Sequence, residues 1–360
     1  MTRVYNFSAG PATLPEEVLL QAQTEFLNWQ GLGMSVMEVG HRTNPYEELS
    51  ANVVGMTREI LNIPDSHEVL YLTNSSRAHF AMVPMNLLRG KTKADYFHTG
   101  VWSKMALDEA KRYCKVNVAA TSEGLEFNGI PQPESWQLDE QAAYVHYTTN
   151  ETINGVEFPQ IPEVKDVPLV ADMTSSIMSE PIDIERFGLI YAGTQKNMGI
   201  AGLSLVIVRK DLLGEVLPFT PTMYNYQIHA ENHSLYNTPA SFAVYMTGLM
   251  LAWIKAQGGV KAMQVLNQRK AEKLYHCIDN SRLYFNTVMP AYRSKISVPF
   301  FLRNKDLEAK FLAQAKLEGL VALKGHRLLG GIRACMYNAM PEQGVAKLIA
   351  FMQQFEKANY

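Results

Sequence analysis

Short apolar runs alternate with longer amphipathic segments along most of this 360-residue chain. The runs are apolar on both faces, which is typical of strands in a sheet that is covered on both sides. They lie at 68–73, 94–98, 142–146, 168–172, 189–192 and 203–208. The segments between them have the spacing of helices that bury one face. They include 15–29, 46–60, 240–256 and 261–279. We therefore expect an α/β fold with a mainly parallel sheet and a ligand site at the C-terminal strand ends.

The pattern changes after about residue 280. Strand-like runs at 295–302 and 331–335 alternate there with helical segments at 306–318 and 341–356, which predicts a smaller α+β domain. Pro299 favours an edge strand or a bulge. The break at Gly258-Gly259 is the predicted domain boundary. The expected parts are an N-terminal segment, 1–15, a large domain, 16–258, and a small C-terminal domain, 259–360.

Composition excludes several classes of protein. With 47% hydrophobic and 19% charged residues, the chain is not disordered. The net charge of -2 argues against a nucleic-acid partner. We expect no membrane span, and a cytoplasmic location, because the sequence shows neither a long apolar run nor a signal-like N-terminus. Cys114, Cys277 and Cys335 are too few and too scattered for a disulfide framework or a zinc site.

Two residues at strand ends can carry cofactor chemistry. Lys196 lies in a loop of small and polar residues between two apolar runs. Partial burial lowers the pKa of a lysine, so its amine can form a Schiff base with a carbonyl group; the alternative is a solvated loop lysine. Asp172 ends the run at 168–172, where a carboxylate can pair with a protonated pyridine nitrogen. The alternative for Asp172 is a helix N-cap, because Thr174 and two serines follow.

Two further segments follow predicted strands. The residues Asn-Ser-Ser-Arg at 74–77 precede a helical segment, and the backbone N–H groups at a helix start can bind an anion. The alternative is an ordinary strand-to-helix turn. Trp102 follows the next strand. Its indole can cover the face of a flat cofactor ring, although packing in the core is the alternative.

Arginine and histidine occur side by side near glycines. The pairs are His41-Arg42 and His326-Arg327, and Arg333 lies in another glycine-rich segment. The guanidinium fork suits carboxylate or phosphate, so several forks indicate a small dianionic substrate. The alternative for each pair is a solvated surface position. Because the histidines lack the spacing of a metal site, we expect no metal.

These segments together resemble the phosphoserine aminotransferase family over essentially the whole chain. The motifs that carry the resemblance lie at 6–12, 35–42, 193–197, 236–239, 322–327 and 331–340. The family consists of class-V, fold-type I aminotransferases, which are homodimers that depend on pyridoxal 5′-phosphate. The resemblance implies a large cofactor-binding domain with a seven-stranded, mainly parallel sheet, a smaller α+β domain, and an N-terminal segment that packs near the active site.

The resemblance also implies roles for residues around the cofactor ring. Lys196 would hold the cofactor as a Schiff base and would move the proton at the substrate Cα. Asp172 would pair with the ring nitrogen. Trp102 would stack on the ring, and Thr152 would form a hydrogen bond with the ring hydroxyl.

The remaining implied roles concern anionic groups. The cofactor phosphate would be bound by Ser76, Arg77 and Gln195, and by Asn237 and Thr238 from the other subunit. The distal anion of the substrate would be bound by Arg77, His326 and Arg327, and by His41 and Arg42 from the other subunit. Arg333 would bind the α-carboxylate.

The reaction that the resemblance implies is a ping-pong transamination. L-Glutamate and 3-phosphohydroxypyruvate would give 2-oxoglutarate and O-phospho-L-serine, and the 4-phosphohydroxy-L-threonine reaction of pyridoxine biosynthesis is expected as well. The alternatives are a fold-type I aminotransferase with another small amino-acid substrate and a non-catalytic pyridoxal-phosphate-binding protein. The chain departs from the family pattern at Ala9, where some relatives have a serine, and at residues 74–76, where many relatives have glycines.

Overall fold

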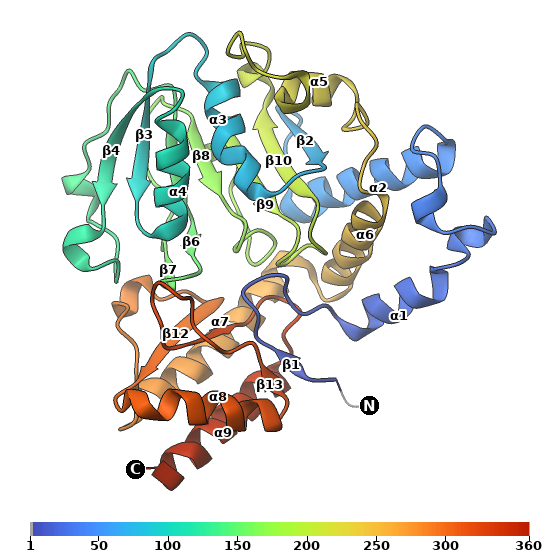
Figure 1. Ribbon diagram of the computed structural model, residues 1–360. Coiled ribbons are helices and arrows are strands. Elements are labelled where there is room, and N and C mark those ends of the chain that lie inside the picture. The colour runs from blue at the N-terminus through green and yellow to red at the C-terminus, as the bar shows by residue number, and fades with distance from the viewer. Residues whose placement is uncertain (1–2, 360) are drawn as a thin grey trace.

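The computed structural model describes residues 3–359. Its largest feature is a seven-stranded sheet with the order β2-β10-β9-β8-β5-β3-β4 (Figure 1). The strands are β2 (His67–Leu72), β3 (Lys93–His98), β4 (Lys115–Thr121), β5 (Val145–Thr148), β8 (Leu169–Asp172), β9 (Leu189–Gly193) and β10 (Ser204–Arg209). Neighbouring strands are parallel except at β10, which runs antiparallel to β2 and β9. The prediction of a mainly parallel sheet is confirmed.

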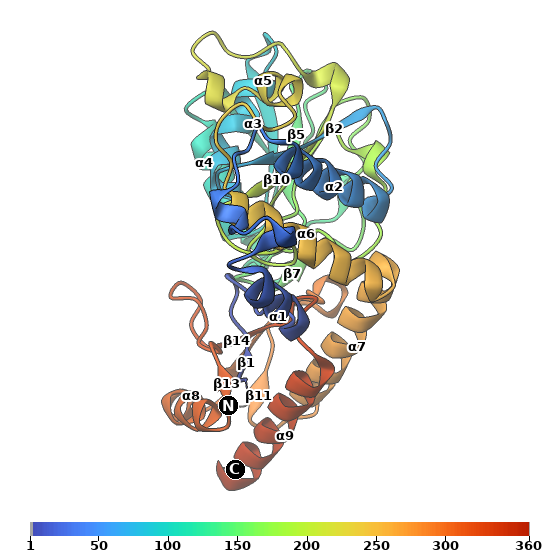
Figure 2. The ribbon, with the colours of Figure 1, turned by 90° about the vertical axis from the view of Figure 1, so that its right-hand side faces the viewer.

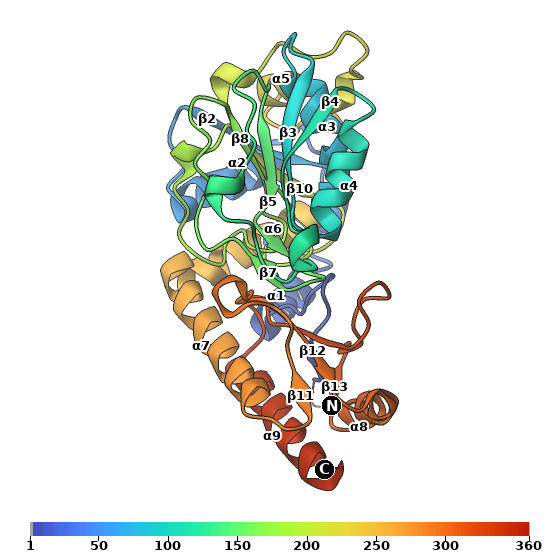
Figure 3. The same cartoon turned by 90° about the vertical axis from the view of Figure 1, so that its left-hand side faces the viewer.

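Helices cover both faces of this sheet (Figures 2 and 3). One face carries α3 (His79–Leu87) and α4 (Val101–Ala110), and the other carries α2 (Asn44–Leu61) and α6 (Ser241–Ala256). Strand β10 shows why its residues are apolar on both sides. Val206 packs into the core under α3 and α4, whereas Leu205 and Ile207 pack into the core under α2 and α6. The continuous apolar run therefore fills two cores at once.

The apolar pattern did not predict β4, the edge strand beside β3. One of its central residues, Val118, is 42% exposed, and both end residues, Lys115 and Thr121, are exposed as well. An edge strand that is partly solvated has no continuous apolar run. The pattern also placed the next strand too early, because β5 begins at Val145.

A smaller α+β part follows the large sheet. Its three-stranded sheet has the order β11-β12-β14. The strands are β11 (Tyr284–Phe285), β12 (Ser297–Leu302) and β14 (Ile332–Cys335), and the helices are α7 (Gly259–Asp279), α8 (Glu308–Leu317) and α9 (Glu342–Asn359). The edge prediction for Pro299 is wrong, because β12 is the central strand. However, β11 pairs only with Phe301 and Leu302 of β12. At Pro299, β12 therefore has a paired strand on one side, β14, and none on the other.

Helix α7 connects the two parts (Figure 1). Its first turns place Val260 and Met263 in the core of the large sheet, and its later turns place Ala271 and Leu274 in the core of the small part. The division into 1–15, 16–258 and 259–360 stays a prediction, since one helix contributes to both cores.

The N-terminal segment runs along both parts. Strand β1 (Tyr5–Asn6) pairs in parallel with β13 (Leu320–Val321) of the small part, and the backbone N–H of Ala12 donates to the carbonyl of Gln195 at 2.9 Å. The shorter elements are α1 (Glu16–Glu25), β6 (Asn150–Glu151), β7 (Val156–Glu157) and α5 (Tyr226–Glu231). Within residues 3–359, no helix is long and apolar enough to cross a membrane.

Candidate active site

A cavity of about 270 Å³ lies where several strands of the large sheet end. Thr148 ends β5 and Asp172 ends β8, and both line it. The location agrees with the expectation for an open α/β sheet. Nine predicted site residues line this cavity: Ser76, Arg77, Trp102, Thr152, Asp172, Gln195, Lys196, His326 and Arg333.

Lys196 follows β9 and is 8% exposed. Its Nζ lies 5.9 Å from the ring centre of Trp102 and 6.0 Å from that of Tyr337. Burial lowers the pKa of Lys196 to about 8, although the carboxylate of Asp172 opposes the shift. The solvated loop lysine is therefore not what the structure contains. A buried amine with a lowered pKa is a better nucleophile near neutral pH.

Asp172 is 6% exposed, and its Oδ1 accepts a hydrogen bond of 2.9 Å from the backbone N–H of Thr174. Burial raises its pKa, while the hydrogen bonds from Thr174 and the charge of Lys196 lower it. Turns follow Asp172, and the next helical turn begins only at Ile184. Asp172 therefore does not cap a helix, and its buried carboxylate lies in a cavity that also contains a lysine.

Trp102 is fixed at the start of α4 from two directions. Its Nε1 donates to Thr152 Oγ1 at 2.9 Å, and its backbone N–H donates to Glu151 Oε2 at 3.0 Å. The other carboxylate oxygen of Glu151 accepts from the backbone and hydroxyl of Ser103, at 2.8 and 2.7 Å. Because Glu151 is fully buried, it holds the helix start through charge-assisted hydrogen bonds. The indole is thereby oriented toward the cavity.

Two arginines and a histidine line the rim of the cavity. The guanidinium of Arg77 lies 5.7 Å from the ring centre of Trp102. Arg333, on β14, reaches from the small part to donate from Nη1 to the carbonyl of Thr152 at 3.1 Å. Burial and the charges of Arg333 and Arg327 lower the pKa of His326. These groups can bind two anionic substituents of a small ligand.

Five predicted residues are not among those that line this cavity: His41, Arg42, Asn237, Thr238 and Arg327. Arg42 instead lines a surface cavity of about 900 Å³, together with Leu235 and Tyr236. Arg42 and the two residues that directly precede Asn237 therefore border one region of the surface. That arrangement is consistent with the prediction that both segments belong to a site in another subunit.

Sequence reasoning missed polar residues that line the same cavity. Thr148 Oγ1 and Asn150 Oδ1 are buried and have no hydrogen-bond partner within residues 3–359. Unpaired buried polar atoms are uncommon, and beside a cavity they indicate a polar ligand. Glu151 was missed as well. Its position three residues after the end of β5 could have suggested a site residue, but its partner Ser103 lies far away in sequence.

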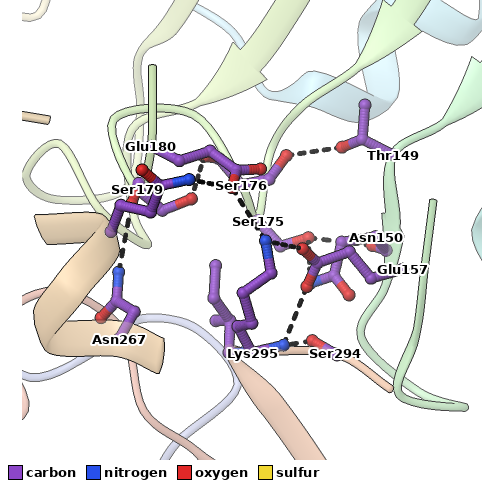
Figure 4. Close-up of polar contacts among 12 residues, drawn as sticks. Thr149, Asn150, Glu157, Ser175, Ser176, Ser179, Glu180, Asn267, Ser294 and Lys295 are labelled. Carbon is purple, nitrogen blue, oxygen red and sulfur yellow. Dashed lines mark hydrogen bonds and ion pairs between the residues drawn. The ribbon is translucent and has the colours of Figure 1, made fainter. Parts of the chain in front are cut away.

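A partly buried ion cluster joins the small part to the segment that follows Asp172 (Figure 4). Lys295 Nζ lies 2.8 Å from Glu157 Oε1 and 2.8 Å from Glu180 Oε2, and its backbone N–H donates to Glu157 at 2.8 Å. Burial by itself lowers the pKa of Lys295, but the two carboxylates outweigh it and keep the pKa above its usual value. This cluster holds β12 against the loop that begins at the floor of the site.

Comparison with known proteins agrees with this geometry. The model of the aminotransferase class-V family matches residues 4–348. The phosphoserine aminotransferase of Laribacter hongkongensis (strain HLHK9) is 53% identical over 357 residues, 99% of each chain. That of Coxiella burnetii (strain CbuG_Q212) is 50% identical over 360 residues, 100% of both chains.

Solved structures give the same result. Phosphoserine aminotransferase from Bacillus circulans subsp. alkalophilus superposes with a TM-score of 0.97 at 43% identity, covering 99% of each chain. The pyridoxal-phosphate-bound enzyme from Trichomonas vaginalis superposes with a TM-score of 0.93 at 39% identity, covering 98% of this chain and 100% of the other. The chain therefore belongs to the class-V aminotransferase family and, within it, to the phosphoserine aminotransferases. The predicted family and fold class are confirmed.

Proposed function

We propose that the chain transfers an amino group between L-glutamate and 3-phosphohydroxypyruvate, giving 2-oxoglutarate and O-phospho-L-serine. The observation that carries the proposal is one cavity that combines buried Lys196 and Asp172 with the guanidinium groups of Arg77 and Arg333 and the imidazole of His326. A nucleophilic amine serves the chemistry, and several cations suit substrates that are dianions.

The cofactor is pyridoxal 5′-phosphate, and the residues present fit it. Thr148 Oγ1 and Asn150 Oδ1 are buried beside the cavity and have no hydrogen-bond partner within residues 3–359. A ligand with polar groups would supply their missing partners. Lys196 would hold the carbonyl carbon, Asp172 the ring nitrogen, and Ser76 the phosphate. When bound, the cofactor withdraws electrons from the substrate Cα and so permits loss of its proton.

The chain's own residues supply orientation and proton transfer. The Lys196 amine, with its pKa lowered to about 8 by burial, can take a proton from the substrate Cα and would deliver it to the carbon that carried the carbonyl group of the cofactor. The Asp172 carboxylate favours a protonated ring nitrogen through its charge. Trp102 covers one side of the site and is held by Thr152. The hydroxyl hydrogen of Thr152 remains available, because Oγ1 accepts from the indole.

Both substrates must use the same cationic groups. Glutamate ends in a carboxylate and the phospho-acid in a phosphate, and a guanidinium fork binds either one. We assign the α-carboxylate to Arg333 and the distal anion to Arg77 and His326. Arg327 is exposed at the rim and would join them when a ligand binds.

We further propose a homodimer in which each subunit completes the other's site. His41-Arg42 and Asn237-Thr238 are not among the residues that line the cavity of their own chain, and Arg42 lines a surface cavity together with Tyr236, the residue before Asn237. The chain also exposes large apolar side chains close in sequence to these segments, including Met34, Met37 and Tyr236. A second copy that covers these side chains would bring the two segments to its partner's cavity.

The test is an absorption titration of the purified protein loaded with pyridoxal phosphate. O-Phospho-L-serine should convert the visible band of the lysine-linked cofactor to the pyridoxamine form, while L-serine should not. If the band is present but does not change on addition of O-phospho-L-serine, the assignment of the cofactor stands and the assignment of the substrate is wrong. Absence of the band after addition of pyridoxal phosphate would reject the proposal. The predicted pyridoxine-pathway reaction is tested by the same titration with 4-phosphohydroxy-L-threonine.

A further inference from the structure

A chain of hydrogen bonds runs beneath the loop that follows β2. Tyr226 OH lies 2.8 Å from His79 Nδ1, and His79 Nε2 lies 2.8 Å from Ser204 Oγ. Ser204 Oγ in turn donates to Asn74 Oδ1 at 2.5 Å. His79 and Ser204 are fully buried. The chain therefore links α5, α3 and β10 to the first residue of the loop 74–78, which contains Ser76 and Arg77.

The donors in this chain can be assigned in one direction. The amide oxygen of Asn74 only accepts, so the single hydroxyl hydrogen of Ser204 is used there. Ser204 must then accept from His79, which places the ring hydrogen on Nε2. The bare Nδ1 of the neutral ring accepts from the Tyr226 hydroxyl. Every group in the chain has a partner, and none carries a charge.

The ring of His79 is fixed in orientation as well as in protonation. It stacks on Tyr191 at 5.1 Å between ring centres and on Tyr226 at 5.9 Å. Burial lowers the pKa of His79 to about 3, so the ring is neutral in any ordinary buffer. Tyr191 pairs in register with Asp172. One histidine thus lies between the floor of the ring site and the loop at its phosphate end.

The loop above the chain uses ordinary backbone conformations. Asn74, Ser75 and Ser76 are not among the described residues with positive φ, so glycine is not required there. Two backbone hydrogen bonds shape the turn, from Asn74 to Leu72 at 2.8 Å and from Ala78 to Ser75 at 2.9 Å. The side chain of Asn74 adds an anchor to β10 that a glycine could not supply.

We propose that Asn74, Ser204 and His79 are positioning residues, which hold the loop 74–78 at the height above the sheet that lets it bind the cofactor phosphate. This inference rests on the proposed function, because it takes that loop as the phosphate site. The expected effect is selective. Breaking this series of hydrogen bonds should weaken binding of the phosphate group and leave binding of the pyridine ring and the carbonyl group unchanged.

The experiment measures equilibrium binding of two ligands to the cofactor-free protein. Pyridoxal phosphate contains the phosphate group, and pyridoxal lacks it. Ser204→Ala removes the central hydroxyl, and His79→Phe keeps a stacked ring without its nitrogens. In both variants we expect the Kd of pyridoxal phosphate to rise about tenfold, as for one lost hydrogen bond to a charged group, while that of pyridoxal changes less than about twofold.

The matched control is Ser122→Ala, which removes another fully buried hydroxyl whose partner is the carbonyl of Gly129. It should leave both dissociation constants unchanged. Equal weakening of both ligands in Ser204→Ala and His79→Phe would assign the chain a general structural role and overturn the inference, as would no weakening of either. A wild-type protein that binds neither ligand, or both equally, would instead reject the proposed function.

Discussion

Arg333 donates a hydrogen bond of 3.1 Å from Nη1 to the backbone carbonyl of Thr152. The bond crosses from β14 of the small part to the segment that positions Trp102. One edge of the guanidinium is therefore fixed, while the group still lines the cavity. A planar fork held in this way is preorganised for a carboxylate.

Arg333→Lys should weaken amino-acid binding without loss of cofactor. The guanidinium of arginine has donors on two sides, whereas lysine has a single ammonium group. Lysine therefore cannot keep the hydrogen bond to Thr152 and also bind a carboxylate in the same geometry. We expect the KM for L-glutamate to rise about a hundredfold, measured by steady-state kinetics, with an unchanged absorption band of the bound cofactor. Arg303→Lys, at an exposed arginine over Phe285, is the control and should leave KM unchanged. An unaltered KM in Arg333→Lys would remove Arg333 from the substrate site.

The rate of cofactor attachment to the cofactor-free protein should report the pKa of Lys196. Burial lowers this pKa to about 8, and only the neutral amine attacks a carbonyl group. The rate should therefore rise with pH up to about 8 and then level off, as followed by stopped-flow absorbance with pyridoxal. A rate that keeps rising toward about pH 10, the range of an ordinary lysine, would contradict the lowered pKa.

Asp172→Asn should abolish most activity without destabilising the fold. The amide oxygen can still accept from the backbone of Thr174, and the variant removes a carboxylate whose pKa burial raises. We expect kcat to fall about a hundredfold or more, because the variant lacks the negative charge that would stabilise a protonated ring nitrogen. Thermal unfolding should give a Tm no lower than that of the wild type. A large drop in Tm with a parallel drop in kcat would assign Asp172 a structural role.

Mixing two inactive variants should restore activity if the sites are shared. Arg42→Ala removes an arginine that we assign to the site of the other subunit. Lys196→Ala removes the lysine from the subunit's own site. A hybrid dimer has one site with both residues intact, so unfolding and refolding an equal mixture should regain about a quarter of wild-type activity. Each variant refolded alone is the control. If the mixture stays inactive while size measurements show dimers, Arg42 does not serve the neighbouring site.

Lys270→Met should destabilise the protein. Lys270 is fully buried, and Nζ donates to the carbonyls of Met336, Tyr337 and Met340 at 3.0, 2.9 and 3.1 Å. Methionine would leave these acceptors unpaired, at a cost on the order of 3 kcal/mol in chemical denaturation. The exposed Lys273, replaced by Met as a control, should cost less than about 1 kcal/mol.

The same variant has a pH signature. Burial lowers the pKa of Lys270 to about 7, so the unfolded chain binds more protons than the folded chain between about pH 7 and pH 10. Wild-type stability therefore rises with pH across this window, and Lys270→Met should lack part of that rise. Identical slopes in the two proteins would show that the carbonyls keep Lys270 protonated.

The sequence predicted those elements whose local apolar pattern matches the burial of their residues in the fold. Strand β10 was predicted because Val206 and Ile207 are buried on opposite faces, and Lys196 was predicted because two such strands enclose its loop. Edge strand β4 was not, since Val118 is 42% exposed. Its apolar pattern is interrupted for the same reason that it forms an edge.

The unpredicted site features depend on contacts between distant segments. Glu151 meets Ser103 only because β5 lies beside β3 in the sheet. His79 bonds to Ser204 because α3 packs across β10. Neither neighbour is visible in a local window, so no spacing rule could identify these residues. Arg333, by contrast, was predicted from a motif that continues along one strand.

The position of β2 at the edge of the sheet has a consequence for synthesis of the chain. Its neighbour in the sheet is β10, and Leu72 pairs with Ser204. While the ribosome makes the intervening segment, β2 and the loop after it have no strand to pair with. A nascent chain that stops before β10 therefore exposes an apolar strand, and the phosphate end of the site can form only after the ribosome has passed residue 204.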